Sequence, residues 1–302
     1  RPPFVAAQVP PANPERSFHH RIRDLMTDNG FTEIYNYSFL SDAAAAAFGR
    51  GPDELVRVAN PIASDQNLLR DSLIPGIAKN VNDNARHYES FRLFEIGHQI
   101  HKRSEGLPDE VPHLTAALYS KAGDGRDGLF EIKRVALCLA PGAKLEPTQA
   151  RAYEHPARAA ELSVQGQTIG RIFEFHPSIV ETGRAAVLDI DLDALRRVTR
   201  ETSKYTPLRR FPTSAFDLSV VTDLRRPVGG VQESLAKLAG ADLVNIEFLR
   251  EYTGAPLPEG SKSVSFRLTA GSLERTLSLE EVGEIRSRVI EGMRSQGFDL
   301  RL

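Results

Sequence analysis

The chain has 302 residues, more than one hydrophobic core usually organises, so two domains are expected. It is 41% hydrophobic and 26% charged with a net charge of −2, which excludes a strong basic field for nucleic acid. No apolar run approaches the roughly 18 residues of a membrane-spanning helix, which argues against a membrane protein.

The only cysteine, Cys138, excludes a disulfide framework and a multi-cysteine zinc site. Because it lies in the apolar run VALCLA, a buried thiol is expected, and the low cysteine count fits a reducing cytoplasm. The first residues, RPPFVAAQVPPANPE, lack the layout of a secretory signal and are interpreted as the cut end of a longer chain.

A proline-rich linker is expected at 1–12, followed by a first domain at 13–200. Asn13 and Pro14 predict the start of a helix that Gly30 ends, and its apolar residues recur at helical spacing. The apolar stripe of this helix fits either an interface with a partner protein or packing in the core of the domain. Further helices are expected at 43–47, 72–86 and 129–140, and strands at 31–40, 55–60, 91–100, 114–120, 160–165, 168–175 and 185–192.

The basic stretch from 195 to 212 is interpreted as the connection between domains, with the linker proper at 201–211. The second domain, 212–302, alternates strand and helix in the order βαββαβ. Such a chain folds into one antiparallel sheet with both helices on one face, which leaves the other face open for a ligand. The expected elements are 216–223, 228–240, 243–252, 263–270, 277–297 and 298–302.

Nine segments in this order and spacing resemble the beta subunit of bacterial phenylalanine–tRNA ligase. They are GFTEIYNYSF, NPIASDQNLLRDSLIPGI, FRLFEIG, DGLFEIK, YEHPARAAEL, IGRIFEFHP, LRRFP, EYTGAPLPEGSKSVSFRL and ERTLSLEEV. The resemblance covers essentially the whole chain. It implies an α+β protein, in which a class II synthetase-like antiparallel sheet domain precedes a ferredoxin-like anticodon-binding domain.

Class II synthetases hold ATP with one arginine in a strand pattern Phe-Arg-x-Glu and a second arginine after a glycine-rich strand. Here Arg92 and Glu95 have one residue too many between them, which places them on opposite faces of a strand. The second pattern is absent. No catalytic residue is therefore expected, and Arg92 and Glu95 are interpreted as a vestigial site held by ion pairs or strand-end contacts.

The resemblance implies that Tyr252, in Tyr-Thr-Gly, stacks on an anticodon base and that Ser263 hydrogen-bonds this base. Arg250 stands where the family usually has an aspartate. The aspartate would accept a hydrogen bond from a base edge, whereas the arginine side chain only donates hydrogen bonds, so Arg250 is expected to reach a phosphate instead. Arg209 and Arg210 are further candidates for phosphate contacts.

The family's partners are the catalytic alpha subunit, in an (αβ)₂ heterotetramer, and tRNA(Phe). ATP and Mg²⁺ belong to the holoenzyme, and no cofactor is expected in this fragment. His98, His101 and His113 are expected at loops and strand ends, not at a metal. Two alternatives remain: an active single-chain synthetase of the organellar type, disfavoured by the absent second arginine, and a stand-alone regulatory paralogue that binds a small metabolite.

Overall fold

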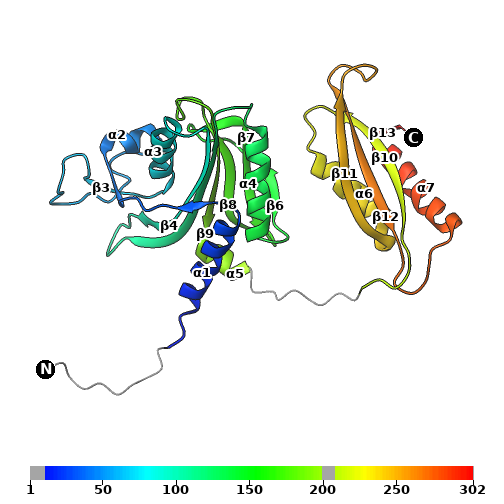
Figure 1. Cartoon of the computed structure of the whole chain (residues 1–302), viewed down its shortest axis with the longest axis horizontal. Coiled ribbons are helices and arrows are strands. Elements are labelled where there is room, and N and C mark those ends of the chain that lie inside the picture. The colour runs from blue at the N-terminus through cyan, green and yellow to red at the C-terminus, as the bar shows by residue number, and fades with distance from the viewer. Residues whose placement is uncertain (1–10, 199–207, 302) are drawn as a thin grey trace. The chain divides into compact units, whose positions relative to one another are not determined.

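Two compact units make up the chain, Arg1–Ser203 and Lys204–Leu302, each with its own sheet (Figure 1). The computed structural model describes residues 11–198 and 208–301, without the side chain of Arg301. Most of each predicted linker, 1–12 and 201–211, therefore lies outside the described residues.

A seven-stranded sheet organises the first unit, in the order β1-β4-β5-β9-β8-β7-β6. Its neighbouring strands are antiparallel except β1 and β4, which run parallel. Strands β2 and β3 form a separate pair. The bounds are β1 Thr32–Glu33, β2 Phe39–Leu40, β3 Leu68–Leu69, β4 Ser90–His101, β5 Asp109–Ser120, β6 Lys144–Pro147, β7 Glu154–Val164, β8 Gln167–Phe175 and β9 Arg184–Asp191.

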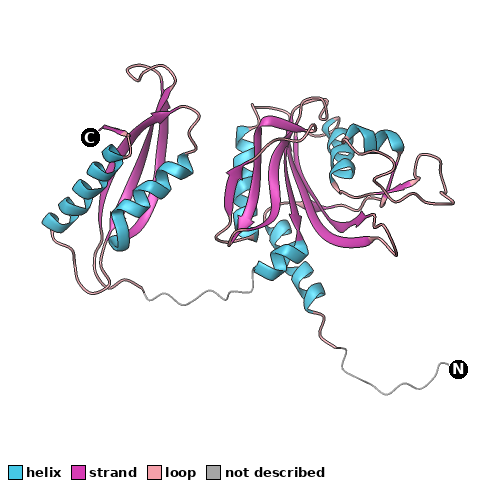
Figure 2. Ribbon diagram, turned by 180° about the vertical axis from the view of Figure 1, so that it is seen from behind, coloured by secondary structure: helices cyan, strands magenta, loops and turns pink. Residues whose placement is uncertain are grey.

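Helices cover both faces of this sheet (Figures 1 and 2). Helices α1 (Pro14–Asp28), α4 (Arg126–Leu139) and α5 (Leu192–Val198) pack on one face, and α2 (Asp42–Ala47) and α3 (Ile74–Ala85) lie on the other. Successive residues of β5 point alternately to the two faces of the sheet. Ala116 packs in the core on the α4 side, and Ala117 packs in the core on the α3 side. This alternation follows from the two-residue period of a strand.

Helix α1 begins as the sequence predicts. The side chain of Asn13 accepts a hydrogen bond from the backbone nitrogen of Arg16 at 2.9 Å and so caps the first turn. Phe18, Ile22 and Met26 are buried against the sheet. The apolar stripe therefore belongs to the core of the first unit, where each such side chain contributes about 1.5–3 kcal/mol.

The predicted strand 31–40 is two short strands separated by an irregular segment. Ile34 still donates to the carbonyl of Phe94, but Tyr35 and Tyr37 beyond it are 77% and 80% exposed. The side chain of Asn36 is bound to Glu95, which takes the segment out of the ladder with β4. The predicted strand 55–60 is also wrong, since this stretch has only an isolated bridge between Arg57 and Leu68.

Strands β3 and β6 and helix α5 of the first unit were not predicted. Strand β6 pairs with β7, and α5 occupies part of the stretch interpreted as a connection. Leu192, Ala194 and Leu195 of α5 are buried in the core of the first unit. Helix formation there is explained by this packing, because seven residues are too few for a stable isolated helix.

The side chain of Cys138 is exposed, so the expected buried thiol is wrong. Helix α4 turns Ile132, Val135 and Leu139 toward the core. Cys138 lies on the solvent side of the same helix, because residues next to each other in a helix face different directions. The apolar run that contains it is wider than the buried stripe.

The second unit has a four-stranded antiparallel sheet in the order β11-β12-β10-β13. Helices α6 and α7 lie side by side on one of its faces (Figure 2). The predicted βαββαβ order is confirmed. The bounds are β10 Ser214–Asp223, α6 Val228–Ala239, the 3-10 turn η1 Gly240–Asp242, β11 Leu243–Thr253, β12 Ser261–Ala270, α7 Leu279–Ser295 and β13 Asp299–Arg301.

The face of this sheet that lies under the helices is apolar, and the other face is polar. Val220, Val264 and Phe266 are fully buried under α6 and α7. Ser219 and Ser265, each one position away, point to the open face, where their hydroxyl groups are 2.8 Å apart. The strand period therefore leaves one polar, uncovered face.

Candidate functional site

The open face of the second sheet brings three predicted binding residues together. Tyr252 of β11 pairs directly with Ser263 of β12, and Arg250 pairs with Ser265 in the next row. Side chains that are directly opposite on neighbouring strands have Cβ atoms about 5 Å apart. Tyr252, Ser263 and Arg250 therefore form one cluster.

A bulge in β11 creates this cluster. Phe248 pairs with Phe266 on the face under the helices, and the register then shifts by one residue before Arg250. Without this extra residue, strict alternation would send Arg250 and Tyr252 to the same face as Phe248. The bulge turns both side chains to the open face.

Tyr252 is 47% exposed, and its hydroxyl group donates a hydrogen bond to the carbonyl of Ala255. This bond fixes one end of the ring while much of the side chain stays accessible. Ser263, which pairs with Tyr252 across the two strands, is only 7% exposed. Arg250 is exposed, and no salt bridge to it is present among the described residues.

Arg209 and Arg210 do not join this cluster. Arg209 donates to the carbonyl of Gly271 at 3.4 Å, just past the end of β12. Eight residues of strand separate Ser263 from Gly271, which corresponds to about 26 Å. Both arginines are exposed, but they lie at the opposite end of the sheet from Tyr252.

The open face also holds an ion pair that sequence reasoning missed. Arg267 binds both carboxylate oxygens of Asp217, at 2.8 and 2.9 Å, across β12 and β10. The hydrogen bonds from Arg267 hold the pKa of Asp217 below its usual value. The two-residue alternation of these strands would have placed both side chains on the open face.

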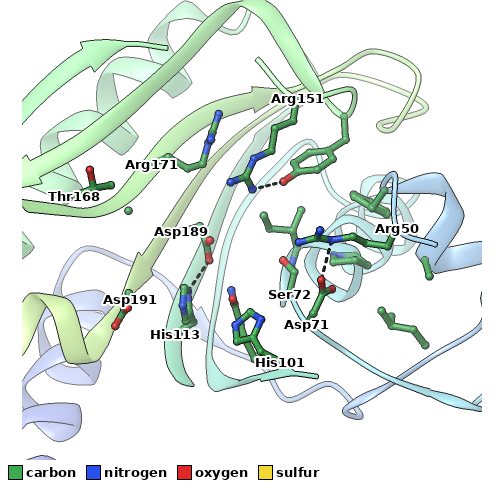
Figure 3. A pocket seen from close by; sticks show the side chains of 18 of the residues that line it. Arg50, Asp71, Ser72, His101, His113, Arg151, Thr168, Arg171, Asp189 and Asp191 are labelled. Atoms are coloured by element: carbon green, nitrogen blue, oxygen red, sulfur yellow. Dashed lines mark hydrogen bonds and ion pairs between the residues drawn. The ribbon is translucent and has the colours of Figure 1, made fainter. Parts of the chain in front are cut away.

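The first unit contains a cavity of about 390 Å³ on the α2–α3 face of its sheet (Figure 3). Three arginines line it. Arg50 comes from the segment after α2, Arg151 from the segment between β6 and β7, and Arg171 from β8. The sequence prediction missed all three, because they are far apart along the chain and match no motif.

Four carboxylates line the same cavity, namely Asp71, Glu161, Asp189 and Asp191. The nearly buried Asp189 accepts a hydrogen bond from Thr115 at 2.6 Å. Burial raises the pKa of Asp189, but His113, whose Nδ1 lies 3.4 Å away, and the hydrogen bond from Thr115 outweigh it, so the pKa is lowered overall. The carboxylate is therefore ionised at neutral pH.

A polar row crosses five strands of this sheet, and three of its residues, Asp189, Arg171 and Glu161, line the cavity. Cross-strand pairing joins Glu95, Thr115, Asp189, Arg171 and Glu161 in that order. Each residue is about 4.8 Å from the next in the hydrogen-bonding direction. A polar row under a cavity is unusual for a sheet that is covered on both faces, and it points to a site.

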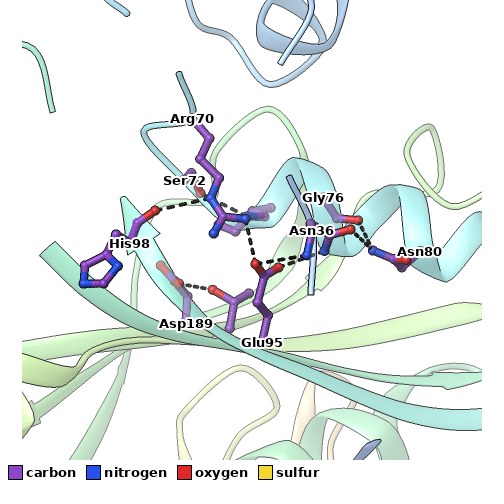
Figure 4. Close-up of polar contacts among 10 residues, drawn as sticks. Asn36, Arg70, Ser72, Gly76, Asn80, Glu95, His98 and Asp189 are labelled. Atoms are coloured by element: carbon purple, nitrogen blue, oxygen red, sulfur yellow. Dashed lines mark hydrogen bonds and ion pairs between the residues drawn. The ribbon is translucent and has the colours of Figure 1, made fainter. Parts of the chain in front are cut away.

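The structure places Arg92 and Glu95 on opposite faces of β4, as their spacing predicts. Arg92 lies on the α4 side, where it donates to Glu131 at 3.0 Å and to the carbonyl of Asn29 at 2.9 Å. Glu95 lies on the other face, where Arg70 donates to it at 2.7 Å and Asn36 at 2.8 Å (Figure 4). Both charges have protein partners, and neither side chain lines the cavity.

The junction from β9 to α5 supplies no arginine to the cavity. Arg196 in α5 pairs with Asp193 at 3.2 Å, and Asp191 is the residue of this junction that lines the cavity. Neither motif position supplies a cation to the cavity, although three other arginines line it. Their positions differ from the motif positions, and carboxylates accompany them.

The histidines also differ in part from expectation. His98, His101 and His113 all lie on the paired strands β4 and β5, and His101 and His113 line the cavity. Among residues 11–198 and 208–301, no group of three His, Cys, Asp or Glu side chains is placed to hold a metal ion. No helix in these ranges is long and apolar enough to cross a membrane.

Solved structures with a similar fold include pyrrolysyl-tRNA synthetase from Desulfitobacterium hafniense, with a TM-score of 0.51 at 15% identity. It matches over 63% of this chain and 74% of its own. A second structure, PylSc from the same organism, has a TM-score of 0.50 at 16% identity, over 61% and 68% of the two chains. At such identity the likeness concerns the fold alone, and the predicted class II synthetase-like, α+β architecture is confirmed.

Sequence relatives carry a more specific result. The phenylalanine–tRNA ligase beta subunit of Solibacter usitatus is 58% identical over 300 residues, 99% of this chain and 39% of the relative. That of Carboxydothermus hydrogenoformans is 29% identical over 312 residues, 96% of this chain and 39% of the relative. The chain thus spans well under half the length of these relatives.

Two family models cover nearly the whole chain. Residues 1–192 match the phenylalanyl tRNA synthetase beta chain CLM domain, and residues 209–301 match the ferredoxin-fold anticodon binding domain. The chain therefore belongs to the phenylalanyl-tRNA synthetase beta chain family.

Proposed function

We propose that this chain is a noncatalytic part of a two-subunit phenylalanine–tRNA ligase. In this proposal it scaffolds the catalytic alpha subunit in a cytoplasmic (αβ)₂ heterotetramer and binds the anticodon of tRNA(Phe). The holoenzyme attaches phenylalanine to tRNA with ATP and Mg²⁺, which act at the alpha subunit. The observation that carries the RNA-binding role is the pairing of Tyr252 with Ser263 on the uncovered face of the second sheet.

The geometry of Tyr252 suits base stacking. Its hydroxyl group is held by Ala255, so little side-chain freedom is lost when a base stacks on the ring. Stacking of a base on an aromatic ring contributes about 1–3 kcal/mol. Ser263 is the nearest cross-strand hydroxyl group for the base edge, and Arg250 in the next row would reach a phosphate.

The cavity of the first unit supports a role without amino-acid activation. Phosphoryl chemistry on ATP requires cations arranged around the phosphates. Arg92 is bound to Glu131 on the other face of the sheet, and four carboxylates line the cavity itself. A triphosphate would meet these negative charges, so the unit is suited to scaffolding.

Binding of the anticodon stem-loop of tRNA(Phe) tests the proposal. Fluorescence anisotropy of the labelled stem-loop against the chain should give saturable binding that weakens with salt. A stem-loop of the same length with a scrambled anticodon is the control and should bind more weakly. Equal affinity for the two RNAs would contradict anticodon recognition.

Co-expression with a catalytic alpha subunit tests the scaffolding role. A stable complex is expected after size-exclusion chromatography, and the chain alone should give no amino-acid-dependent pyrophosphate exchange. Exchange by the chain alone would overturn the noncatalytic assignment. Failure to co-purify would overturn the scaffolding role and leave the RNA result standing.

A further inference from the structure

The cavity of the first unit has two unlike sides. Its floor carries Arg171 and Asp189, directly paired on β8 and β9. Its wall on the α2–α3 side includes apolar Ala45, Phe48 and Ile74, together with the ion pair of Arg50 and Asp71 at 2.8 Å. With a volume of about 390 Å³ it lies in the size range of small-molecule sites. Because Arg50 and Asp71 pair with each other, a charged floor and the apolar part of this wall suit a small molecule with a charged head and an apolar body.

Charges of both signs in the cavity have no ionic partner in the described part of the chain. Arg151 donates to the hydroxyl group of Tyr153 at 2.7 Å and contacts no carboxylate through its guanidinium group. Asp191 accepts a hydrogen bond from the backbone nitrogen of Ala194 at 2.8 Å and contacts no cationic side chain. One positive and one negative group thus remain available to a ligand.

Arg171 adds a donor to this set. Its guanidinium group donates to Glu154 at 2.6 Å, yet its Nε is buried without a hydrogen-bond partner. The Oε1 of Glu154 is buried and unpaired as well. The Arg171 side chain is 14% exposed and lines the cavity, so a ligand there can contact its accessible part.

The balance of charges selects the class of ligand. Four carboxylates against three arginines disfavour a polyphosphate. An amine alone would leave Arg151 unpaired, and a carboxylate alone would leave Asp191 unpaired. A zwitterion can pair with both Arg151 and Asp191. Because Arg171 and Asp189 are opposite each other, their Cβ atoms are about 5 Å apart, which neighbouring carboxylate and ammonium groups can bridge.

We propose that this cavity binds a free α-amino acid with an apolar side chain. Its carboxylate lies at Arg151 and Arg171, and its ammonium group lies at Asp189 and Asp191 (Figure 3). Its side chain packs against the wall that contains Phe48. This site lies within the first unit and does not depend on anticodon binding by the second.

Isothermal titration calorimetry of the 302-residue chain tests the proposal. The catalytic subunit must be left out, because it binds an amino acid itself. The probes are L-phenylalanine and L-leucine, with phenethylamine, 3-phenylpropanoate and ATP as comparisons. At least one amino acid should bind about tenfold or more tightly than the one-headed analogues and ATP, because these lack one of the two charge-assisted contacts. No binding of either amino acid at millimolar concentration, or equal binding of an analogue, overturns the proposal.

Two substitutions locate the site. Asp191→Asn removes the charge but keeps an oxygen to accept from Ala194, and Arg151→Gln removes the charge of an exposed side chain. Each should weaken amino-acid binding about tenfold. Asp83→Asn and Arg86→Gln change charges of the same unit outside the cavity and should leave binding unchanged.

The thermal unfolding midpoint of each variant separates lost binding from lost structure. If Asp191→Asn unfolds, the affinity of Arg151→Gln tests the site instead. The guanidinium group of Arg151 contacts only Tyr153 among the described side chains, so its removal should leave the fold intact. Affinity equal to that of the two control variants would place the amino acid elsewhere and overturn the assignment.

Discussion

The guanidinium group of Arg70 donates a hydrogen bond of 2.7 Å to Glu95, and the two side chains are only 6% and 2% exposed. Asn36 donates to the other oxygen of the same carboxylate at 2.8 Å (Figure 4). Glu95 therefore ties the segments that follow β1 and β3 to strand β4. A buried charge that has all its partners inside the protein acts as a brace, and its removal leaves the other charge unpaired.

Glu95→Ala should destabilise the first unit by about 3–5 kcal/mol, because it leaves the buried guanidinium group of Arg70 without a carboxylate partner. Urea unfolding of the chain measures this loss, with the transition of the second unit as an internal reference. Asp83→Ala, at an exposed carboxylate of α3, should change stability by no more than about 0.5 kcal/mol. Similar effects of the two substitutions would show that the buried pair is not a brace.

Tyr252→Ala should weaken binding of the tRNA(Phe) anticodon stem-loop by about 1–3 kcal/mol, through loss of base stacking. Tyr252→Phe keeps the ring and loses only the hydrogen bond to Ala255, so its effect should be smaller. Fluorescence anisotropy measures both. Tyr88→Ala, at a tyrosine of the first unit that is 58% exposed, is the matched control. Unchanged affinity of Tyr252→Ala would refute the stacking role.

Gly170→Ala should be strongly destabilising, by about 1–3 kcal/mol or more. A Cβ at this position would lie 2.2 Å from the carbonyl oxygen of Asp189, and a backbone atom in a paired strand cannot move away. Gly283→Ala in α7 meets open space and should stabilise the second unit by about 0.5–1 kcal/mol. Thermal unfolding of the two variants should therefore shift in opposite directions, and shifts in the same direction would contradict the packing.

Glu131 gives a pH-dependent contribution to stability. Hydrogen bonds from Arg134 first, and then from Arg92, lower the pKa of Glu131 from 4.5 to about 2. A carboxyl group with a lowered pKa in the folded state stabilises the protein above its unfolded pKa, and this effect is lost as the pH falls. Glu131→Gln should cost about 1 kcal/mol at pH 7, since the group is partly exposed.

The test is urea unfolding of wild type and Glu131→Gln between pH 7 and pH 2. The difference in unfolding free energy between the two proteins should be constant down to about pH 4.5 and then shrink toward pH 2. A difference that stays constant down to pH 2 would show that the ionised carboxylate of Glu131 contributes nothing.

Local patterns predicted the elements that carry strong periodic signals. Asn13 and Pro14 fix the start of α1 by capping chemistry, and the βαββαβ order of the second unit follows from its alternating apolar segments. Segments with little apolar periodicity were predicted poorly. The stretch 31–40 has β-branched and aromatic residues, but its conformation depends on the bond between Asn36 and Glu95, 59 positions apart in the chain.

The sequence by itself determined the βαββαβ order of the second unit and the placement of Arg92 and Glu95 on opposite faces of one strand, because these follow from short-range periodicity. The fold class of the first unit was implied by the resemblance of its segments to a known family. Only the tertiary structure decided which side chains meet. Arg151 and Asp191 reach one cavity through the pairing of strands distant in sequence, and the bulge before Arg250 turns Tyr252 to the open face. Register and bulges depend on the partner strand, so no single segment contains the information that fixes them.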